Sequence, residues 1–260
     1  MQVRLQFLGT GASMGVPIIG CNCEVCTSTS AYNKRFRSSA LLTIGTKKFL
    51  LDVGPDFRMQ ALRNGITSLD GIFLTHLHFD HIGGIDDLRI FYFRSKAKIP
   101  CVLSKETYAE LQMRYYYLLH PMVDDFPVSA QVDFRILEND FGKIDFEGIS
   151  LRYVTFFQKE TKVTGFIFGK LAYISDIREY TDELIRALEG IDTLVISALR
   201  PLPTSMHFSI DEAIHFAQKV GARRTYFTHI SHEIEHKKIS QTLPPDIHLA
   251  YDGLEIECLG

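Results

Sequence analysis

FLTHLHFDHIGG, residues 73–84, places three histidines and one aspartate within six positions, from His76 to His81. An apolar run precedes them and a glycine pair follows. A strand projects alternate side chains to one face, so His76 and His78 are expected to reach the same point. If the chain then turns, Asp80 and His81 face a second point beside the first. Imidazole and carboxylate suit first-row divalent ions such as zinc, manganese or iron. A polar loop of hydrogen-bonding histidines is the alternative, but four such groups before two glycines favour a metal site.

Two further polar residues stand where apolar stretches end. Asp176 closes LAYISD, residues 171–176, and His229 closes TYFTH, residues 225–229. Either residue alone is ambiguous, because an aspartate after a strand is often a helix cap. Together with the four residues above they form a coherent ligand set, in which Asp176 could bridge two ions and His229 could complete the ligands of the second ion.

The order of apolar patterns predicts an α/β fold. Short strands ending at glycine fill the first fifty residues, and helical patterns follow at about 55–64, 86–95 and 104–119. Later strands alternate with amphipathic helices at about 181–189 and 209–220. The last helix begins with the capping box Ser209 and Glu212 and ends at Gly221. This order favours sheet layers covered by helices over a helical bundle or an all-β barrel.

Length and composition limit the classes of protein. The 260 residues are 46% hydrophobic and 23% charged, which fits one domain over residues 1–260. The formal net charge of −3 gives no basic field for nucleic acid, which is possible but disfavoured as a partner. No apolar run approaches the roughly 20 residues of a membrane span, so we expect a cytoplasmic protein that does not enter a membrane.

Five cysteines include a trio, Cys21, Cys23 and Cys26, in CNCEVC. Disulfide frameworks belong to small secreted chains, so this spacing indicates metal rather than cystine. His232 lies three residues after His229 and is able to complete a tetrahedral Cys₃His zinc site. Such a site would connect the N-terminal loop to the loop that follows His229. A redox trio and simple packing cysteines are the alternatives.

These motifs resemble those of the metallo-β-lactamase superfamily, and within it the PhnP-like cyclic-phosphate phosphodiesterases. The resemblance runs from LGTGASMGVPIIGCNCEVC through LTHLHFDHIGG, AYISD and THISH to YDGLEI. It implies an αββα sandwich of mixed sheets, with the metals at one rim of the paired sheets. It also implies one structural zinc at the cysteine trio and His232.

The resemblance also assigns roles by position. His76 and His78 would hold the first ion, and the second would be held by Asp80, His81 and His229. Asp176 would bridge the two ions. His207, in PLPTSMHFS, matches the approximate place of a histidine that donates a proton to the leaving group; an exposed loop histidine is the alternative. Asp80 and His207 are the candidate catalytic residues.

One ligand of the family pattern is missing. The family has a third histidine before a glycine–aromatic pair, here Gly165–Phe166, and counting back places Gln158 at that position. Three interpretations remain open. The first ion binds with fewer ligands and activity is reduced, or Gln158 or Glu160 fills the position for a different metal, or only the second ion is retained.

The resemblance favours a metal-dependent phosphodiesterase for small cyclic or linear phosphodiesters. One or two active-site ions (zinc, manganese or iron) would supply a metal-bound hydroxide, and His207 would protonate the departing alkoxide. The alternatives are another hydrolase of the superfamily (an RNA-processing nuclease, a thioesterase or a lactonase) and a degenerate metal-binding scaffold, which Gln158 motivates. A homodimer is possible.

Overall fold

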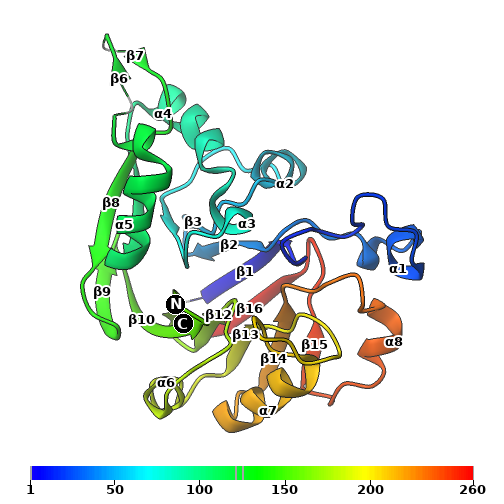
Figure 1. Cartoon of the computed structure of the whole chain (residues 1–260). Helices are drawn as coiled ribbons and strands as arrows, with labels where there is room; N and C mark the ends of the chain where they lie inside the picture. Colours follow the sequence, from blue (N-terminus) through cyan, green and yellow to red (C-terminus); the bar gives the residue numbers. More distant parts are fainter. Residues whose placement is uncertain (1, 121, 125, 260) are drawn as a thin grey trace.

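The structure is a computed structural model that describes residues 2–120, 122–124 and 126–259. Two seven-stranded sheets pack face to face (Figure 1). The first sheet has the order β16 (Glu255–Leu259), β1 (Gln2–Gly9), β2 (Ser39–Ile44), β3 (Lys47–Leu51), β4 (Gly71–Phe73), β5 (Ile99–Ser104) and β8 (Val132–Leu137).

The second sheet also has seven strands. Its order is β15 (Ile247–Leu249), β14 (Arg224–Thr228), β13 (Thr193–Ser197), β12 (Leu171–Ile174), β11 (Thr161–Phe168), β10 (Ile149–Gln158) and β9 (Gly142–Phe146). A separate hairpin pairs β6 (Met122–Val123) with β7 (Phe126–Pro127).

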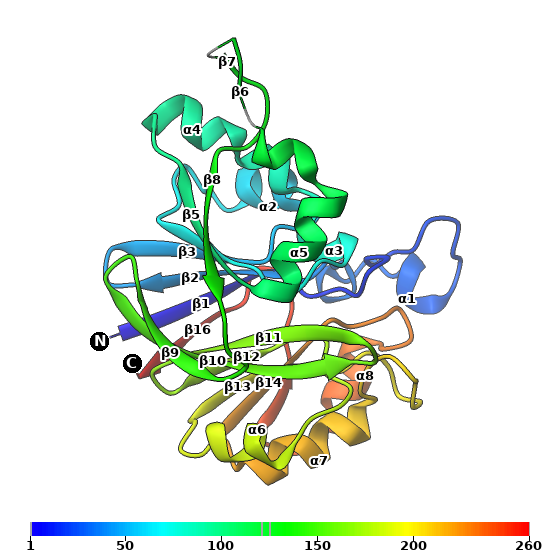
Figure 2. The ribbon, with the colours of Figure 1, turned by 60° about the vertical axis from the view of Figure 1, so that its left-hand side comes forward.

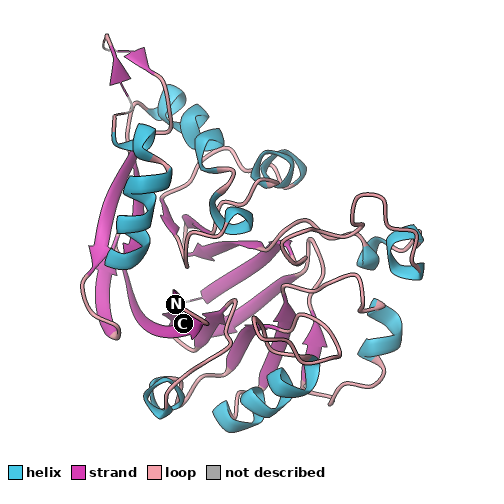
Figure 3. Ribbon diagram, in the orientation of Figure 1, coloured by secondary structure: helices cyan, strands magenta, loops and turns pink. Residues whose placement is uncertain are grey.

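Helices cover the outer faces of both sheets (Figures 2 and 3). Over the first sheet lie α2 (Phe57–Arg63), α3 (Phe79–Ile82), α4 (Arg89–Ser95) and α5 (Lys105–Arg114). Over the second lie α6 (Asp182–Ala187), α7 (Ile210–Val220) and α8 (His236–Ser240). The short helix α1 (Glu24–Thr27) belongs to the N-terminal loop. The predicted α/β class and αββα sandwich are thus confirmed.

Alternation of apolar residues explains the layers. In β1 the side chains of Val3, Leu5 and Phe7 are buried, while their neighbours Gln2 and Arg4 are exposed. Between the sheets, the ring of Phe73 lies 5.0 Å from that of Phe166, centroid to centroid. A second apolar cluster joins α6 and α7 to the second sheet, and a third joins α2, α4 and α5 to the first.

The predicted caps of α7 are confirmed. The backbone N–H of Glu212 donates to Ser209 Oγ at 3.3 Å, and the N–H of Ser209 donates to Glu212 Oε2 at 2.8 Å. Gly221 ends the helix in the left-handed conformation, with φ of 70°. Within the described ranges, no helix is both long and apolar enough to cross a membrane.

Strand direction decides where the site forms. Each sheet is antiparallel on one side and parallel on the other: β3, β4, β5 and β8 run in parallel, as do β12, β13, β14 and β15. The carboxyl ends of parallel strands open onto the same edge, where loops gather side chains for binding. The loops after β3, β4, β12 and β14 carry the residues described next.

Candidate metal centre

Three residues of this rim have a left-handed backbone conformation with positive φ, which residues other than glycine rarely adopt. Asp52, Asp176 and His229 have φ of 61°, 60° and 57°. Such backbone costs of order 1–3 kcal/mol per residue and is characteristic of functional sites. Each of the three follows a buried strand end directly or within two residues, so the strained turn aims the side chain back over the sheet edge.

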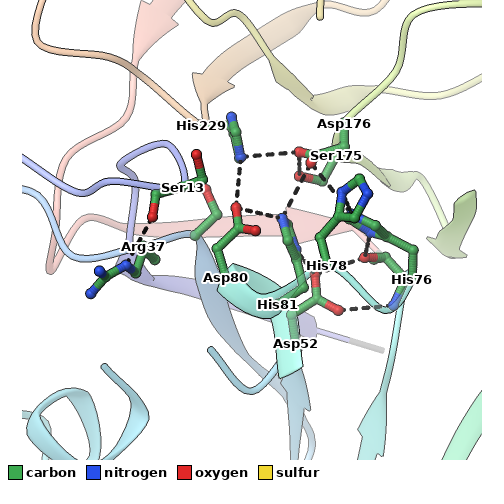
Figure 4. Close-up of polar contacts among 12 residues, drawn as sticks. Ser13, Arg37, Asp52, His76, His78, Asp80, His81, Ser175, Asp176 and His229 are labelled. Carbon is green, nitrogen blue, oxygen red and sulfur yellow. Dashed lines mark hydrogen bonds and ion pairs between the residues drawn. The ribbon is translucent and has the colours of Figure 1, made fainter. Parts of the chain in front are cut away.

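Four predicted ligands meet in one buried group, made of Asp80, His81, Asp176 and His229. Their ligand atoms all lie within 4.8 Å of one another. His81 Nε2 is 3.4 Å from Asp80 Oδ2 and 3.3 Å from Asp176 Oδ2. His229 Nε2 is 3.3 Å from Asp80 Oδ2 and 3.4 Å from Asp176 Oδ1 (Figure 4). The structure therefore brings together the residues that were predicted for the second ion.

A second group lies beside it and is formed by His76, His78 and Asp176. His76 Nε2 is 2.9 Å from His78 Nδ1 and 3.5 Å from Asp176 Oδ2. Asp176 is common to both groups, and its Oδ2 also approaches His81 (Figure 4). This is the placement that a bridging carboxylate requires.

The donor atoms fit divalent cations. His81 Nε2 is buried, and no described residue forms a hydrogen bond with it. Burial alone would lower the pKa of His81, but the carboxylates of Asp176, Asp80 and Asp52 raise this pKa well above its usual value. Burial would raise the pKa of Asp176, yet His229 and His81 hold it well below its usual value. Buried carboxylates and imidazoles at this density need shared protons or a cation, and imidazole with carboxylate is a ligand set for first-row divalent ions.

Sequence reasoning missed Asp52, which holds two of the histidines in place. Its Oδ2 accepts from His81 Nδ1 at 2.7 Å and from Thr75 Oγ1 at 2.9 Å, and its Oδ1 accepts from the backbone N–H of Thr75 at 2.8 Å. Thr75 Oγ1 also lies 2.9 Å from His76 Nδ1. Carboxylates that orient ligating histidines in this way fix the ring tautomer. The signal was available, since Asp52 ends the apolar run KFLL just as Asp176 ends LAYIS.

His207 lies in the same site, although it is far from the other residues in sequence. Its ring stacks on that of His229, with centroids 4.7 Å apart and planes 25° apart. Burial lowers the pKa of His207 to about 4, against the opposing charge of Asp176. The ring is half-buried, so the alternative of an exposed loop histidine is wrong.

Gln158 also faces the site. It is the last residue of β10, and its side chain is buried. Its Nε2 lies 2.9 Å from His207 Nε2. Glu160, the other residue considered for the missing ligand, is exposed in the tight turn between β10 and β11. Of the two residues, only Gln158 is directed toward the site.

These groups open into a cleft of about 820 Å³. Its wall includes His78, Asp80, Gln158, Asp176, His207 and His229, together with Ser13, Phe79 and the segment from Leu199 to Met206. Clefts of roughly 300–1,000 Å³ bind small molecules.

The cysteine trio converges on His232, as predicted. The Sγ atoms of Cys21, Cys23 and Cys26 lie 3.3, 3.4 and 3.5 Å from His232 Nδ1. A backbone hydrogen bond to Cys26 lowers the pKa of Cys23 to about 6, whereas burial raises that of Cys26 to about 11. Three thiols and one imidazole within 4.8 Å fit a closed tetrahedral zinc site.

This cysteine site is connected to the rim by the backbone. The N–H of Ala12 donates to the carbonyl of Ile230 at 3.0 Å, and the N–H of Ile230 donates to the carbonyl of Thr10 at 2.8 Å. Ile230 lies between His229 and the segment that carries His232. A cation held by the three cysteines and His232 would therefore stabilise the loop that follows His229.

Comparison with known proteins agrees with this geometry. Residues 47–230 match the family model described as the beta-lactamase superfamily domain, so the chain belongs to the metallo-β-lactamase superfamily. Within the superfamily it is PhnP-like, as the motifs predicted. The crystal structure of a diphosphatase from the PhnP family superposes with a TM-score of 0.91 at 37% identity, covering 99% of this chain and 98% of that chain.

Two curated relatives are longer than this chain. An octanoyltransferase of Porphyromonas gingivalis is 32% identical over 263 residues, which cover 97% of this chain and 51% of that protein. A ribonuclease Z of Phocaeicola vulgatus is 29% identical over 168 residues, which cover 63% of this chain and 51% of that protein. The aligned regions thus span about half the length of both relatives.

Proposed function

We propose that this chain is a metal-dependent hydrolase that cleaves small cyclic or linear phosphodiesters or the related diphosphate bond. The observation that carries the proposal is the pair of donor groups sharing Asp176 at a cleft whose wall also holds His207. The 37% identical structure of a PhnP-family diphosphatase supports phosphorus as the centre attacked. Phosphodiesters and diphosphates both present a phosphorus with two bridging oxygens and a negative charge, so one site can serve both.

The ligands would divide between two cations. His76, His78 and Asp176 would hold one, and Asp80, His81, Asp176 and His229 the other. Ions in such a pair supply a nucleophile at neutral pH and neutralise charge on the phosphoryl oxygens. The chain contributes a fixed arrangement of ligands: Asp52 sets the orientation of His81, and the strained turns at Asp176 and His229 restrict their side chains.

His207 would donate a proton to the leaving oxygen. Burial lowers its pKa to about 4, so the ring is neutral at pH 7 before substrate binds and acts as an acid only after it gains a proton. A bound phosphate brings negative charge into the cleft and raises this pKa toward its usual value. Proton donation of this kind contributes about 10²–10⁴-fold to the rate.

The cleft favours a small substrate over RNA. Its volume of about 820 Å³ matches a small ligand. The formal net charge of −3 gives the chain no overall attraction for a nucleic-acid backbone.

The test is hydrolysis by protein of measured metal content. The substrates are bis(p-nitrophenyl) phosphate, 2′,3′-cyclic AMP and ADP-ribose, and the variants are His207→Ala and His215→Ala. His215 is the matched control because it is an exposed histidine on α7. We expect turnover of at least one substrate, a loss of about 10²-fold or more in kcat for His207→Ala at unchanged metal content, and no loss for His215→Ala. Metal-loaded protein that cleaves none of the three would overturn the proposal in favour of a binding scaffold.

A further inference from the structure

The donor group formed by His76, His78 and Asp176 is incomplete. It supplies one ligand atom from each of three residues, and Asp176 is shared with the neighbouring group. The neighbouring group supplies four. Divalent ions in protein sites take at least four ligands, of which solvent or substrate contributes part. A cation held by these three residues would therefore need at least one further ligand.

Gln158 presents an unpartnered oxygen in the wall of that cleft. Its side chain is 1% exposed, and its buried Oε1 has no hydrogen-bond partner among the residues that the structure describes. A buried carbonyl oxygen left unpaired is costly, so such atoms are rare in folded proteins unless they bind something. The same cleft is lined by His78 and Asp176.

The backbone holds Gln158 between the two loops that carry this group. The carbonyl of Phe157 accepts from the N–H groups of Arg178 and Glu179 at 2.9 and 2.8 Å, which joins the end of β10 to the loop after Asp176. On the paired strand β11, the N–H of Thr164 donates to the carbonyl of Thr75 at 2.9 Å, directly before His76. These hydrogen bonds hold the β10–β11 hairpin against both loops and so restrain the backbone on which Gln158 stands.

We infer that Gln158 Oε1 is a ligand of the cation held by His76, His78 and Asp176, and that its amide nitrogen holds His207 at the edge of the same site. The two ends of one amide then have separate partners. The oxygen binds the cation, while Nε2 donates to the ring of His207, 2.9 Å from its Nε2. This inference rests on the metal-binding part of the proposed function and adds to it a coupling between the first cation and His207.

The chemistry of the amide oxygen sets the class of metal. A neutral carbonyl-type oxygen suits harder ions such as manganese, whereas imidazole suits zinc. A site with Gln158 in place of a third imidazole is therefore shifted toward manganese relative to a three-histidine site. Replacing the amide by imidazole is expected to shift it back toward zinc.

The experiment measures metal binding directly. Manganese binding to chelator-treated protein is followed by electron paramagnetic resonance, and total metal by elemental analysis. The variants are Gln158→Leu, which keeps the approximate volume and removes the oxygen, and Gln158→His. Glu160→Gln is the matched control, because it changes an exposed side chain two residues away on the same hairpin.

We expect two manganese ions per chain for the wild type and for Glu160→Gln. Gln158→Leu should lose one of them or bind it at least tenfold more weakly, with the other ion unchanged. In competition, Gln158→His should raise the ratio of zinc to manganese at the weaker site at least tenfold. Unchanged manganese number and affinity in Gln158→Leu would overturn the inference, as would a single manganese ion in the wild type.

Failure of this inference is distinct from failure of the proposed function. If Gln158→Leu binds manganese as the wild type does while the wild type hydrolyses a substrate, the inference is wrong and the function stands. If the variant loses the ion while the wild type cleaves no substrate, the ligand is correct and the hydrolase proposal is wrong.

Discussion

Replacement of Asp52 by asparagine should weaken metal binding at both donor groups, although Asp52 belongs to neither. Asp52 is fully buried and has a left-handed φ of 61°, which asparagine tolerates better than most residues. The substitution changes one oxygen to an amide nitrogen without altering size. Its effect is therefore on the direction of hydrogen bonds rather than on packing.

Asp52 Oδ2 accepts from His81 Nδ1 at 2.7 Å, which leaves His81 Nε2 free to bind an ion (Figure 4). An asparagine amide at that place donates instead, so His81 Nδ1 must accept and the proton moves to Nε2. The same reversal passes through Thr75 Oγ1 to His76 Nδ1, 2.9 Å away. Both rings then carry a proton on the nitrogen that faces the other ligands.

Loss of a partner that orients a ligating histidine costs about 10–100-fold in metal affinity. This corresponds to about 1.4–2.8 kcal/mol for each affected site. The assay is a chelator competition with zinc and with manganese, and far-UV circular dichroism verifies folding. The control is Asp70→Asn, whose carboxylate accepts from the backbone N–H of Lys48 at 2.8 Å at the surface and contacts no histidine. A folded Asp52→Asn protein that binds both metals within threefold of the wild type would refute the tautomer argument.

The cysteine site and the histidine–carboxylate site each give one further prediction. Cys26→Ser should remove one zinc per chain and lower Tm by about 4 °C or more, as a loss of about 1–2 kcal/mol does in a chain of this size. The reason is that the loop after His229, which carries His232, loses its anchor. Cys258→Ala, which removes a thiol in β16, should keep the zinc, and an unchanged Tm in Cys26→Ser after loss of the zinc would contradict this role. The pKa values of His81 and His229 are raised in the metal-free site. The protons on these rings therefore stabilise the fold fully below about pH 6.5, and this stabilisation is lost as the pH rises through the folded pKa values. Because a metal ion must displace those protons, the affinity for metal should rise with pH above 6.5. Calorimetry in buffers of different ionisation enthalpy should detect at least one proton released per chain at pH 7. If no proton is released, the rings are already neutral and the reasoning is wrong.

Local sequence determined the parts of this protein that depend on neighbours along the chain. The residues from His76 to His81 lie within six positions, so the short segment after β4 and the single turn of α3 suffice to bring them together. Cys21, Cys23 and Cys26 share one loop for the same reason. Apolar runs closed by Asp176 and His229 marked the strand ends, and Ser209 with Glu212 marked the start of α7.

Tertiary structure alone decided which strand ends share the rim. The order of strands in the two sheets places Asp176 between two donor groups. It also stacks the ring of His207 on that of His229, a contact that no local sequence pattern encodes. Asp52 and Gln158 stand at strand ends in the sequence, but only the fold shows that Asp52 contacts His81 and that Gln158 contacts His207. A buried polar atom must find a partner, and the partner available to it depends on which loops the fold brings within hydrogen-bonding distance.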